Sequence, residues 1–273
     1  MKIPNAKQLW SKLWPVEKAR PVDKLSPYVV GLEDARLGGW FNDATGELYE
    51  GYAVEAHDIV LDVGCGDGGN ASFCANRGAH IILADIDAAN VERAVQRLST
   101  SPARRVDGHV TDANPLPLAD NSVSRIICTE VLEHVDDLLR VTAELVRVGQ
   151  PGALYLITVP DPAAEHLQKR LAAPAYFEHP NHIRIIERED FGRLIEDSGL
   201  IIERRSSHGF FWAMWWLLFW QAENPVGDGV NPSIDAWTET WNAVLKARGG
   251  LKVKETLDAF MPKSQVIVAR KPG

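Results

Sequence analysis

The feature that most constrains the fold is an apolar strand pattern that runs directly into a cluster of glycines. The stretch DIVLDVGCGDGGN, residues 58–70, carries glycine at positions 64, 66, 68 and 69. Glycine lets the backbone turn sharply and approach a ligand closely because it has no Cβ. A buried strand that ends in such a turn and leads into a helix is typical of open α/β folds that bind a nucleoside at the strand end.

β-rich and helical stretches alternate through the rest of the chain, which is the rhythm of parallel βαβ units. Apolar continuity in ALYLITV, residues 153–159, predicts a strand that is covered on both faces. These patterns predict an α/β fold with a doubly wound, mostly parallel, seven-stranded sheet. The expected strands cover residues 58–64, 80–87, 104–112, 122–130, 153–160, 201–207 and 264–272, and the expected helices cover residues 70–78, 88–99, 137–149 and 188–199.

Two segments fall outside this alternation and predict additions to a core formed by residues 46–208 and 264–273. Residues 1–45 predict an N-terminal cap, and residues 209–263 predict a helical insertion between the last two strands. The cap contains an apolar stripe at helical spacing. Its members are Leu9, Trp10, Leu13 and Trp14.

The insertion contains HGFFWAMWWLLFWQ, residues 208–221, with seven aromatic residues between Phe210 and Trp220. Its uncharged run is 14 residues long, whereas a helix needs roughly 20 residues to cross a bilayer. A helix that is apolar on all sides must be covered on several faces. We therefore expect the central helix of an aromatic lid, covered by the helical stretch 233–247 and by the N-terminal helix. Membrane contact is the less favoured alternative, because Lys and Arg do not flank the segment closely.

Composition and charge narrow the class of protein further. A chain of 273 residues with 45% hydrophobic residues is long enough to bury a full core. Its net charge of −8 and its scattered basic residues argue against a nucleic-acid partner. Cys65, Cys74 and Cys128 form no CxxC pair and no zinc spacing, and the N-terminus lacks the apolar stretch of a secretory signal. We therefore expect a cytoplasmic protein with reduced thiols; the oligomeric state stays open.

Two cofactor chemistries fit the glycine turn. Gly64, Gly66 and Gly69 satisfy the pattern GxGxxG, and Asp85 lies 21 positions after Gly64, where nicotinamide enzymes bind a ribose. That pattern alone fits an NAD(P)-dependent oxidoreductase. Asp62, two residues before the first glycine, favours a different cofactor.

With Asp62 included, VLDVGCGDG resembles motif I of the class I S-adenosylmethionine-dependent methyltransferases. In that family the acidic residue lies near the amino-acid end of the cofactor. Asp85, at the end of IILAD, matches the acidic residue that binds the ribose hydroxyls, and Asp112 and Ala113 match a pair that lies against the adenine. EVLEHV, residues 130–135, is similar to the family's fourth-strand motif, in which Glu133 and His134 support a loop.

The resemblance covers residues 58–207 and implies S-adenosylmethionine as the cofactor and a Rossmann-like methyltransferase fold. The segment HIRIIEREDFGRLIEDSGL, residues 182–200, is similar to the segment after the fifth strand in many small-molecule methyltransferases. The cofactor residues that the resemblance implies are Asp62, Gly64, Cys65, Gly66, Gly68, Asp85, Ile86, Asp112, Ala113, Thr129 and Glu130.

Methyl transfer to a hydroxyl needs a base, and histidine is the common choice near neutral pH. His182 matches the family's histidine in its segment and is the first candidate, and His179 is the second. A structural alternative is that His182 and Arg184 only position their loop. Glu178, His179 and His182 could also bind a metal, but two histidines at this spacing without a recognised third ligand predict no metal site.

The nine tryptophans all lie in the two added segments, where aromatic walls could stack on sugar rings or flat aglycones. We therefore expect a small-molecule or glycan acceptor that is methylated on oxygen. The alternatives are N-methylation, an NAD(P)-dependent oxidoreductase, and a non-catalytic protein that binds S-adenosylmethionine.

Overall fold

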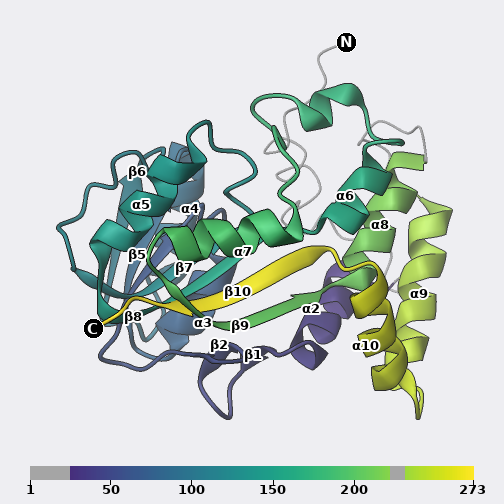
Figure 1. Ribbon diagram of the computed structural model, residues 1–273. Coiled ribbons are helices and arrows are strands. Elements are labelled where there is room, and N and C mark those ends of the chain that lie inside the picture. The colour runs from purple at the N-terminus through teal and green to yellow at the C-terminus, as the bar shows by residue number, and fades with distance from the viewer. Residues whose placement is uncertain (1–24, 222–230) are drawn as a thin grey trace. The chain divides into compact units, whose positions relative to one another are not determined.

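The computed structural model of the protein describes residues 25–221 and 231–273 (Figure 1). The predicted stripe from Leu9 to Trp14 lies outside these residues. The chain divides into two compact units. The helical unit comprises the described parts of Met1–Gly38, Pro160–Ile186 and Ser207–Ser264, and the sheet unit comprises Gly39–Val159, Glu187–Ser206 and Gln265–Gly273.

A seven-stranded sheet forms the centre of the sheet unit, in the order β6-β5-β4-β7-β8-β10-β9. The pairings from β6 through β8 are parallel, so the predicted doubly wound, mostly parallel sheet is confirmed. Because later strands add on opposite sides of β4, the chain order reverses between β4 and β7, which is where such sheets bind ligands. The strands are β4 (Ile59–Val63), β5 (His80–Asp85), β6 (Arg105–Val110), β7 (Val123–Thr129), β8 (Gly149–Pro160), β9 (Ile201–His208) and β10 (Ser264–Arg270).

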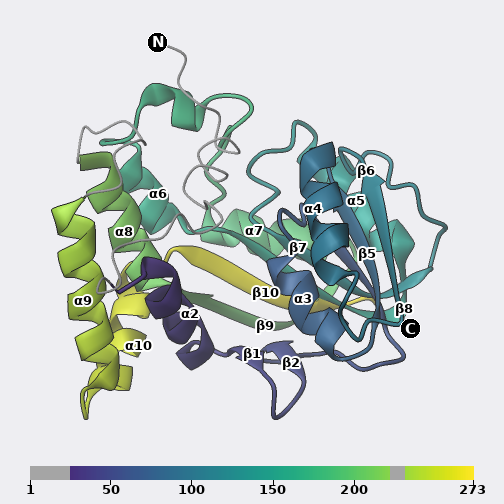
Figure 2. The same ribbon diagram turned by 180° about the vertical axis from the view of Figure 1, so that it is seen from behind.

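Helices cover both faces of this sheet, which explains why its central strands are mostly apolar. α3 (Gly69–Asn76) and α4 (Ala88–Leu98) lie on one face, and α5 (Leu138–Val148) and α7 (Arg188–Asp197) lie on the other (Figures 1 and 2). The side chain of Asp87 caps α4 by accepting a hydrogen bond from the backbone N–H of Ala89 at 2.9 Å. All four helices match predicted ones.

A small antiparallel sheet precedes β4 and was not predicted. It contains β1 (Trp40–Asn42), β2 (Glu47–Tyr49) and β3 (Tyr52–Ala53). Strands of two or three residues are too short to show a period-2 pattern, which is why the sequence did not reveal them. The sheet is fixed by side chains, because Trp40 packs on Tyr49 with ring centroids 4.9 Å apart and the Tyr49 hydroxyl lies 2.6 Å from the Ser206 Oγ.

Six helical elements form the described part of the helical unit. The last three, α8 to α10, lie between β9 and β10, which are neighbours in the sheet, so the predicted helical insertion is confirmed. Residues 39–45 group with the sheet unit and residues 160–186 with the helical unit. The elements are α2 (Pro27–Leu37), α6 (Pro162–Gln168), η1 (Pro174–Phe177), α8 (Phe210–Gln221), α9 (Pro232–Lys246) and α10 (Gly250–Phe260).

The aromatic helix α8 is the core of the helical unit. It lies between α6 and α9, and it also contacts α2 and α10 (Figures 1 and 2). Phe211 is fully buried, and its carbonyl accepts a hydrogen bond from the Trp237 indole of α9 at 3.0 Å. The predicted cover by the helix over 233–247 is therefore present. Over residues 25–221 and 231–273, no helix has the length and apolar character required for a membrane span.

A buried charge cluster joins α2, α9 and α10 to the start of α8. The Lys254 Nζ lies 2.6 Å from an Asp258 oxygen and 3.3 Å from an Asp34 oxygen, and the Trp241 indole donates to Asp34 at 2.8 Å. Asp258 also accepts hydrogen bonds from the Gly209 and Phe210 backbone amides, which α8 itself leaves without partners. Burial raises the pKa of Asp34, and the nearby Lys254 opposes that rise.

Candidate cofactor and active site

Three glycines of the turn after β4 have a backbone conformation that favours glycine, and two of them differ in their surroundings. Gly64, Gly66 and Gly68 have φ angles of 69°, 54° and 82°, a region that favours glycine. A Cβ at Gly64 would lie 2.3 Å from Val131, so that glycine is needed for packing. A Cβ at Gly66 would meet nothing within 4 Å. The turn therefore leaves open space beside Gly66, as the close approach of a ligand requires.

Asp85, at the end of β5, holds the glycine turn in place. Its carboxylate is buried and accepts hydrogen bonds from the Gly66 amide at 3.1 Å and the Asp87 amide at 2.8 Å. A carboxylate can accept up to about four hydrogen bonds, so these two are compatible with binding a pair of ribose hydroxyls. The backbone amide of Cys65 donates to Ala84 at 3.1 Å, and burial raises the pKa of the Cys65 thiol. Cys65 therefore contributes its backbone to the turn and keeps an inert thiol.

Asp62 is buried within β4, close to its carboxyl end. Burial raises the pKa of its carboxyl to about 7, a backbone hydrogen bond from Ala71 lowers it, and the charge of Asp85 raises it. A cation beside Asp62 would favour the charged form of the carboxyl. The position therefore fits an ammonium group, as the resemblance implies.

Ile86, Asp112 and Ala113 follow the ends of β5 and β6. Ile86 is 62% exposed, which is unusual for an apolar side chain next to a buried turn. Ala113 is buried with φ of 61°, a strained conformation for a residue other than glycine, and its amide donates to the Thr111 hydroxyl. Asp112 is exposed and accepts a hydrogen bond from the Asn114 amide at 3.0 Å. An exposed apolar side chain beside a loop of fixed conformation would suit packing against a flat adenine base.

Thr129 and Glu130 lie at the end of β7, the neighbour of β4. Asn70 of α3 donates to the Thr129 hydroxyl at 3.1 Å, so Thr129 is tied to the helix that follows the glycine turn. Glu130 has φ of 54°, and its carboxylate accepts a hydrogen bond from the Thr158 hydroxyl at 3.0 Å. Asn70 was not predicted as a site residue, although its position directly after the glycines could have indicated it. The predicted cofactor residues thus all lie at or directly after the carboxyl ends of β4 to β7; their binding role stays a prediction.

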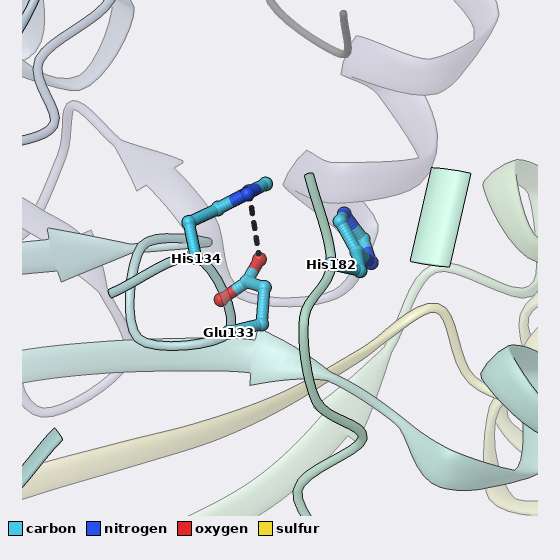
Figure 3. Close-up of side chains that lie close together, drawn as sticks. All are labelled: Glu133, His134 and His182. Atoms are coloured by element: carbon cyan, nitrogen blue, oxygen red, sulfur yellow. Dashed lines mark ion pairs between the residues drawn. The ribbon is translucent and has the colours of Figure 1, made fainter. Parts of the chain in front are cut away.

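Glu133 and His134 form a short-range pair in the loop after β7, as Figure 3 shows. The His134 Nε2 lies 3.7 Å from the Glu133 carboxylate, which is almost fully buried. The His134 amide donates to the Val131 carbonyl at 2.9 Å and closes the turn. These contacts fit the structural role that the resemblance implies. His182, also drawn in Figure 3, belongs to the helical unit.

His182 is buried in the helical unit with a partner at each ring nitrogen. Its Nδ1 lies 2.8 Å from the Glu165 carboxylate of α6, and its Nε2 lies 3.2 Å from the Tyr176 hydroxyl of η1. The His182 amide also donates to the Tyr176 carbonyl at 3.1 Å, which fixes the loop against η1. Glu165 and Tyr176 were not predicted as site residues. A histidine whose one nitrogen is oriented by a carboxylate has the arrangement of a general base.

His179, the second predicted base, differs from His182 in its surroundings. His179 and Glu178 are exposed, whereas His182 is 5% exposed. In the described part of the chain, the ligand atoms of Glu178, His179 and His182 do not gather within 4.8 Å of one another. The alternative metal ligands considered from sequence are therefore not assembled.

Comparisons with known proteins agree with the geometry of the sheet unit. Residues 61–157 match the family described as "Methyltransferase domain". "Methyltransferase GfsG" of Streptomyces halstedii is 38% identical over 115 residues, which are 41% of each chain. "Ubiquinone biosynthesis O-methyltransferase" of Hahella chejuensis is 39% identical over 103 residues, which are 37% of this chain and 42% of that one. The structure of geranyl diphosphate methyltransferase in complex with SAM has a TM-score of 0.54 at 18% identity, covering 90% of this chain and 86% of that one.

These matches confirm the predicted family for the segment that carries the motifs. Residues 61–157 match the methyltransferase domain family, and the fold is the Rossmann-like fold expected of it. The chain spans 41% and 42% of the length of the two curated relatives named above. The helical unit lies outside residues 61–157, so the family match does not describe it.

Proposed function

We propose that the protein transfers a methyl group from S-adenosylmethionine to a hydroxyl oxygen of a small-molecule acceptor. The observation that carries this proposal is the glycine turn: Gly66 faces open space, and Asp85 binds its amide at 3.1 Å. Support for oxygen as the methylated atom comes from the similar O-methyltransferase of Hahella chejuensis and from the base-like environment of His182. A sugar hydroxyl remains the alternative acceptor.

The proposed cofactor residues lie at the ends of neighbouring strands, and different residues would bind different parts of the cofactor. Asp85 would accept hydrogen bonds from the ribose hydroxyls, while Ile86 and Ala113 would contact the adenine. Asp62 would face the ammonium of the amino-acid end. When bound, S-adenosylmethionine supplies a methyl group on a positively charged sulfur, which needs no further activation. The remaining proposed residues at this end are Gly64, Cys65, Gly66, Gly68, Asp112, Thr129 and Glu130.

The chain's own contribution to the reaction is orientation and proton removal. Holding the acceptor oxygen in line with the methyl group can lower the barrier by several kcal/mol. We assign His182, in preference to His179, as the base that receives the proton of the acceptor hydroxyl. The Glu165 carboxylate lies 2.8 Å from the His182 Nδ1 and would stabilise an imidazolium. His179 is exposed. Cytoplasmic location stays a prediction.

Calorimetry with S-adenosylmethionine and S-adenosylhomocysteine tests the proposal. Gly66→Ala should weaken binding at least about tenfold, because a Cβ would fill the space where the ligand lies. Gly152→Ala is the matched control, since Gly152 has φ of 81° and open space around it but lies outside the proposed site. Failure of the wild-type protein to bind either compound would refute the proposal, and binding of NADH instead would favour an oxidoreductase.

A further inference from the structure

We propose that the protein binds reversibly to the surface of an anionic phospholipid bilayer through an exposed face of α10, which we call the α10 surface. This face lies wholly in the helical unit, where α9 and α10 lie side by side and are joined by a short turn (Figures 1 and 2). It is distinct from the aromatic helix α8, which is the core of that unit. The α10 surface consists of Lys246, Arg248, Lys252, Val253, Thr256 and Phe260.

The exposed and buried sides of α10 are the reverse of those of an ordinary helix. Phe260 is 73% exposed and Val253 is 44% exposed. They are seven residues apart, so they lie on the same face of the helix. The charged residues Lys254 and Asp258 lie on another side and are buried. A helix on the surface of a globular protein normally buries its apolar stripe and exposes its charges, so the exposed stripe of α10 indicates a partner.

Basic side chains border this apolar stripe. Lys252 is next to Val253 on α10, Lys246 ends α9, and Arg248 lies in the turn between the two helices. All three basic side chains are exposed, and within residues 25–221 and 231–273 none of them takes part in an ion pair. Residues 240–254 contain no acidic residue, and the first that follows is Glu255. The α10 surface is therefore positive in a chain whose net charge is −8.

The turn before α10 is held by its backbone and is open on its outer side. The Gly250 amide donates to the Ala247 carbonyl at 2.9 Å, and the Val253 amide donates to the Gly249 carbonyl at 3.2 Å. A Cβ at Gly249 would meet nothing within 4 Å. A flat partner can therefore approach Arg248 without displacing the turn.

A bilayer fits the α10 surface better than a protein or a nucleic acid does. One phenylalanine and one valine present far less area than the roughly 800 Å² per partner of a stable protein complex. A nucleic acid would bind the cations and leave the apolar stripe in water. A bilayer surface binds both, because apolar side chains enter the boundary between headgroups and acyl chains while Lys and Arg meet anionic headgroups.

Co-sedimentation with lipid vesicles tests the proposal. We expect the full chain to bind vesicles of phosphatidylglycerol and phosphatidylcholine at an ionic strength of about 0.05 M and to dissociate at about 0.5 M, because salt screens the charges. Vesicles of phosphatidylcholine alone should not bind it. The triple variant Lys246→Gln/Arg248→Gln/Lys252→Gln should bind the mixed vesicles about 100-fold more weakly, since each basic side chain near an anionic surface contributes about fivefold.

Two further variants separate the apolar stripe from the overall charge. Phe260→Ala should weaken binding to the mixed vesicles about tenfold, because an aromatic side chain is lost from the apolar boundary. A control triple variant removes three exposed cations from the sheet unit and should bind within about threefold of the wild type. Its substitutions are Arg93→Gln, Arg140→Gln and Arg193→Gln.

The results that would overturn the proposal are distinct. They are failure of the wild type to bind the mixed vesicles at low ionic strength, equal binding to neutral vesicles, and equal losses in the two triple variants. Binding of the wild type to polyuridylate but to no vesicle would identify a nucleic-acid partner instead. Dimers that form without vesicle binding and that the α10 triple variant loses would identify a second copy of the chain. Either of these two results would also overturn the proposal. Because neither cofactor nor acceptor is present in these measurements, their outcome is independent of the proposed methyl transfer.

Discussion

The two units of the molecule hold their polar side chains in different ways. In the sheet unit, Asp85 accepts hydrogen bonds from the backbone amides of Gly66 and Asp87, which belong to the turns around it. In the helical unit, side chains bind one another between distant helices: the Trp241 indole donates to Asp34, 207 residues away in sequence. A loop built on backbone amides needs a short and recognisable motif, whereas a side-chain network can be assembled from residues scattered along the chain.

Removing the cation of the buried cluster should have the largest effect and would break the network of the helical unit. Lys254→Met leaves the carboxylates of Asp34 and Asp258 buried near each other without their shared positive charge. Loss of one partner from a buried ion pair costs about 3–5 kcal/mol. We expect a decrease of that size in the free energy of unfolding, measured by urea denaturation.

A neighbouring lysine provides the control for this measurement. Lys252 lies on the same helix but is exposed, so Lys252→Met should change the unfolding free energy by less than about 0.5 kcal/mol. Equal effects of the two substitutions would show that the cluster does not stabilise the helical unit. A loss of stability in Lys254→Met that Asp34→Asn partly reverses would identify charge as the cause.

In the sheet unit, Asp85→Ala should affect binding more than stability. Two charge-assisted hydrogen bonds to ribose hydroxyls are together worth about 3 kcal/mol, so the dissociation constant for S-adenosylmethionine should rise about 100-fold. Asp67→Ala, in the same glycine-rich segment but at an exposed position, is the control and should bind as the wild type does. An affinity of Asp85→Ala within about threefold of the wild type would exclude Asp85 as the ribose ligand.

The sequence predicted the sheet unit well for a physical reason. The strands β4 and β5 and the second half of β8 are mostly apolar and buried, so they stand out as continuous runs, and the parallel connections force helices between strands. The glycine turn and Asp85 could be identified because a left-handed backbone beside a ligand demands glycine at fixed spacing. The short strands β1 to β3 gave no such signal, since two or three residues are too few to show a period.

The helical unit was predictable only in outline. The aromatic run of α8 and the stripe of α9 indicated two packed helices, and the structure has both. Glu165 and Tyr176 could not be paired with His182 from sequence. The pairing depends on how the chain folds back on itself between α6 and η1 and after η1, and no sequence pattern marks that path. Lys254 and Asp258 are four residues apart, a spacing that usually marks an ion pair on the exposed face of a helix, yet both side chains are buried.

Helix packing in the helical unit can be tested at one glycine. A Cβ at Gly31 of α2 would lie 2.3 Å from the Trp212 ring of α8, so Gly31→Ala should force the helices apart. Overpacking of this kind costs about 1–3 kcal/mol in unfolding free energy. Gly249→Ala is the control, because a Cβ at Gly249 would meet nothing within 4 Å. Equal stability of the two variants would mean that the contact between α2 and α8 is loose.

The smallest expected effect concerns the charge state of Asp62 and would sharpen the description of the sheet unit. Burial raises the pKa of this carboxyl from 3.8 to about 7, so it is protonated at lower pH and ionised above neutrality. A cofactor ammonium prefers the ionised form, and affinity should therefore rise as the pH increases through the pKa. From about pH 6 to pH 7 the dissociation constant for S-adenosylmethionine should fall about fivefold. Asp62→Asn should bind more weakly and without this pH dependence; a wild-type affinity that stays constant over the same range would place the ammonium away from Asp62.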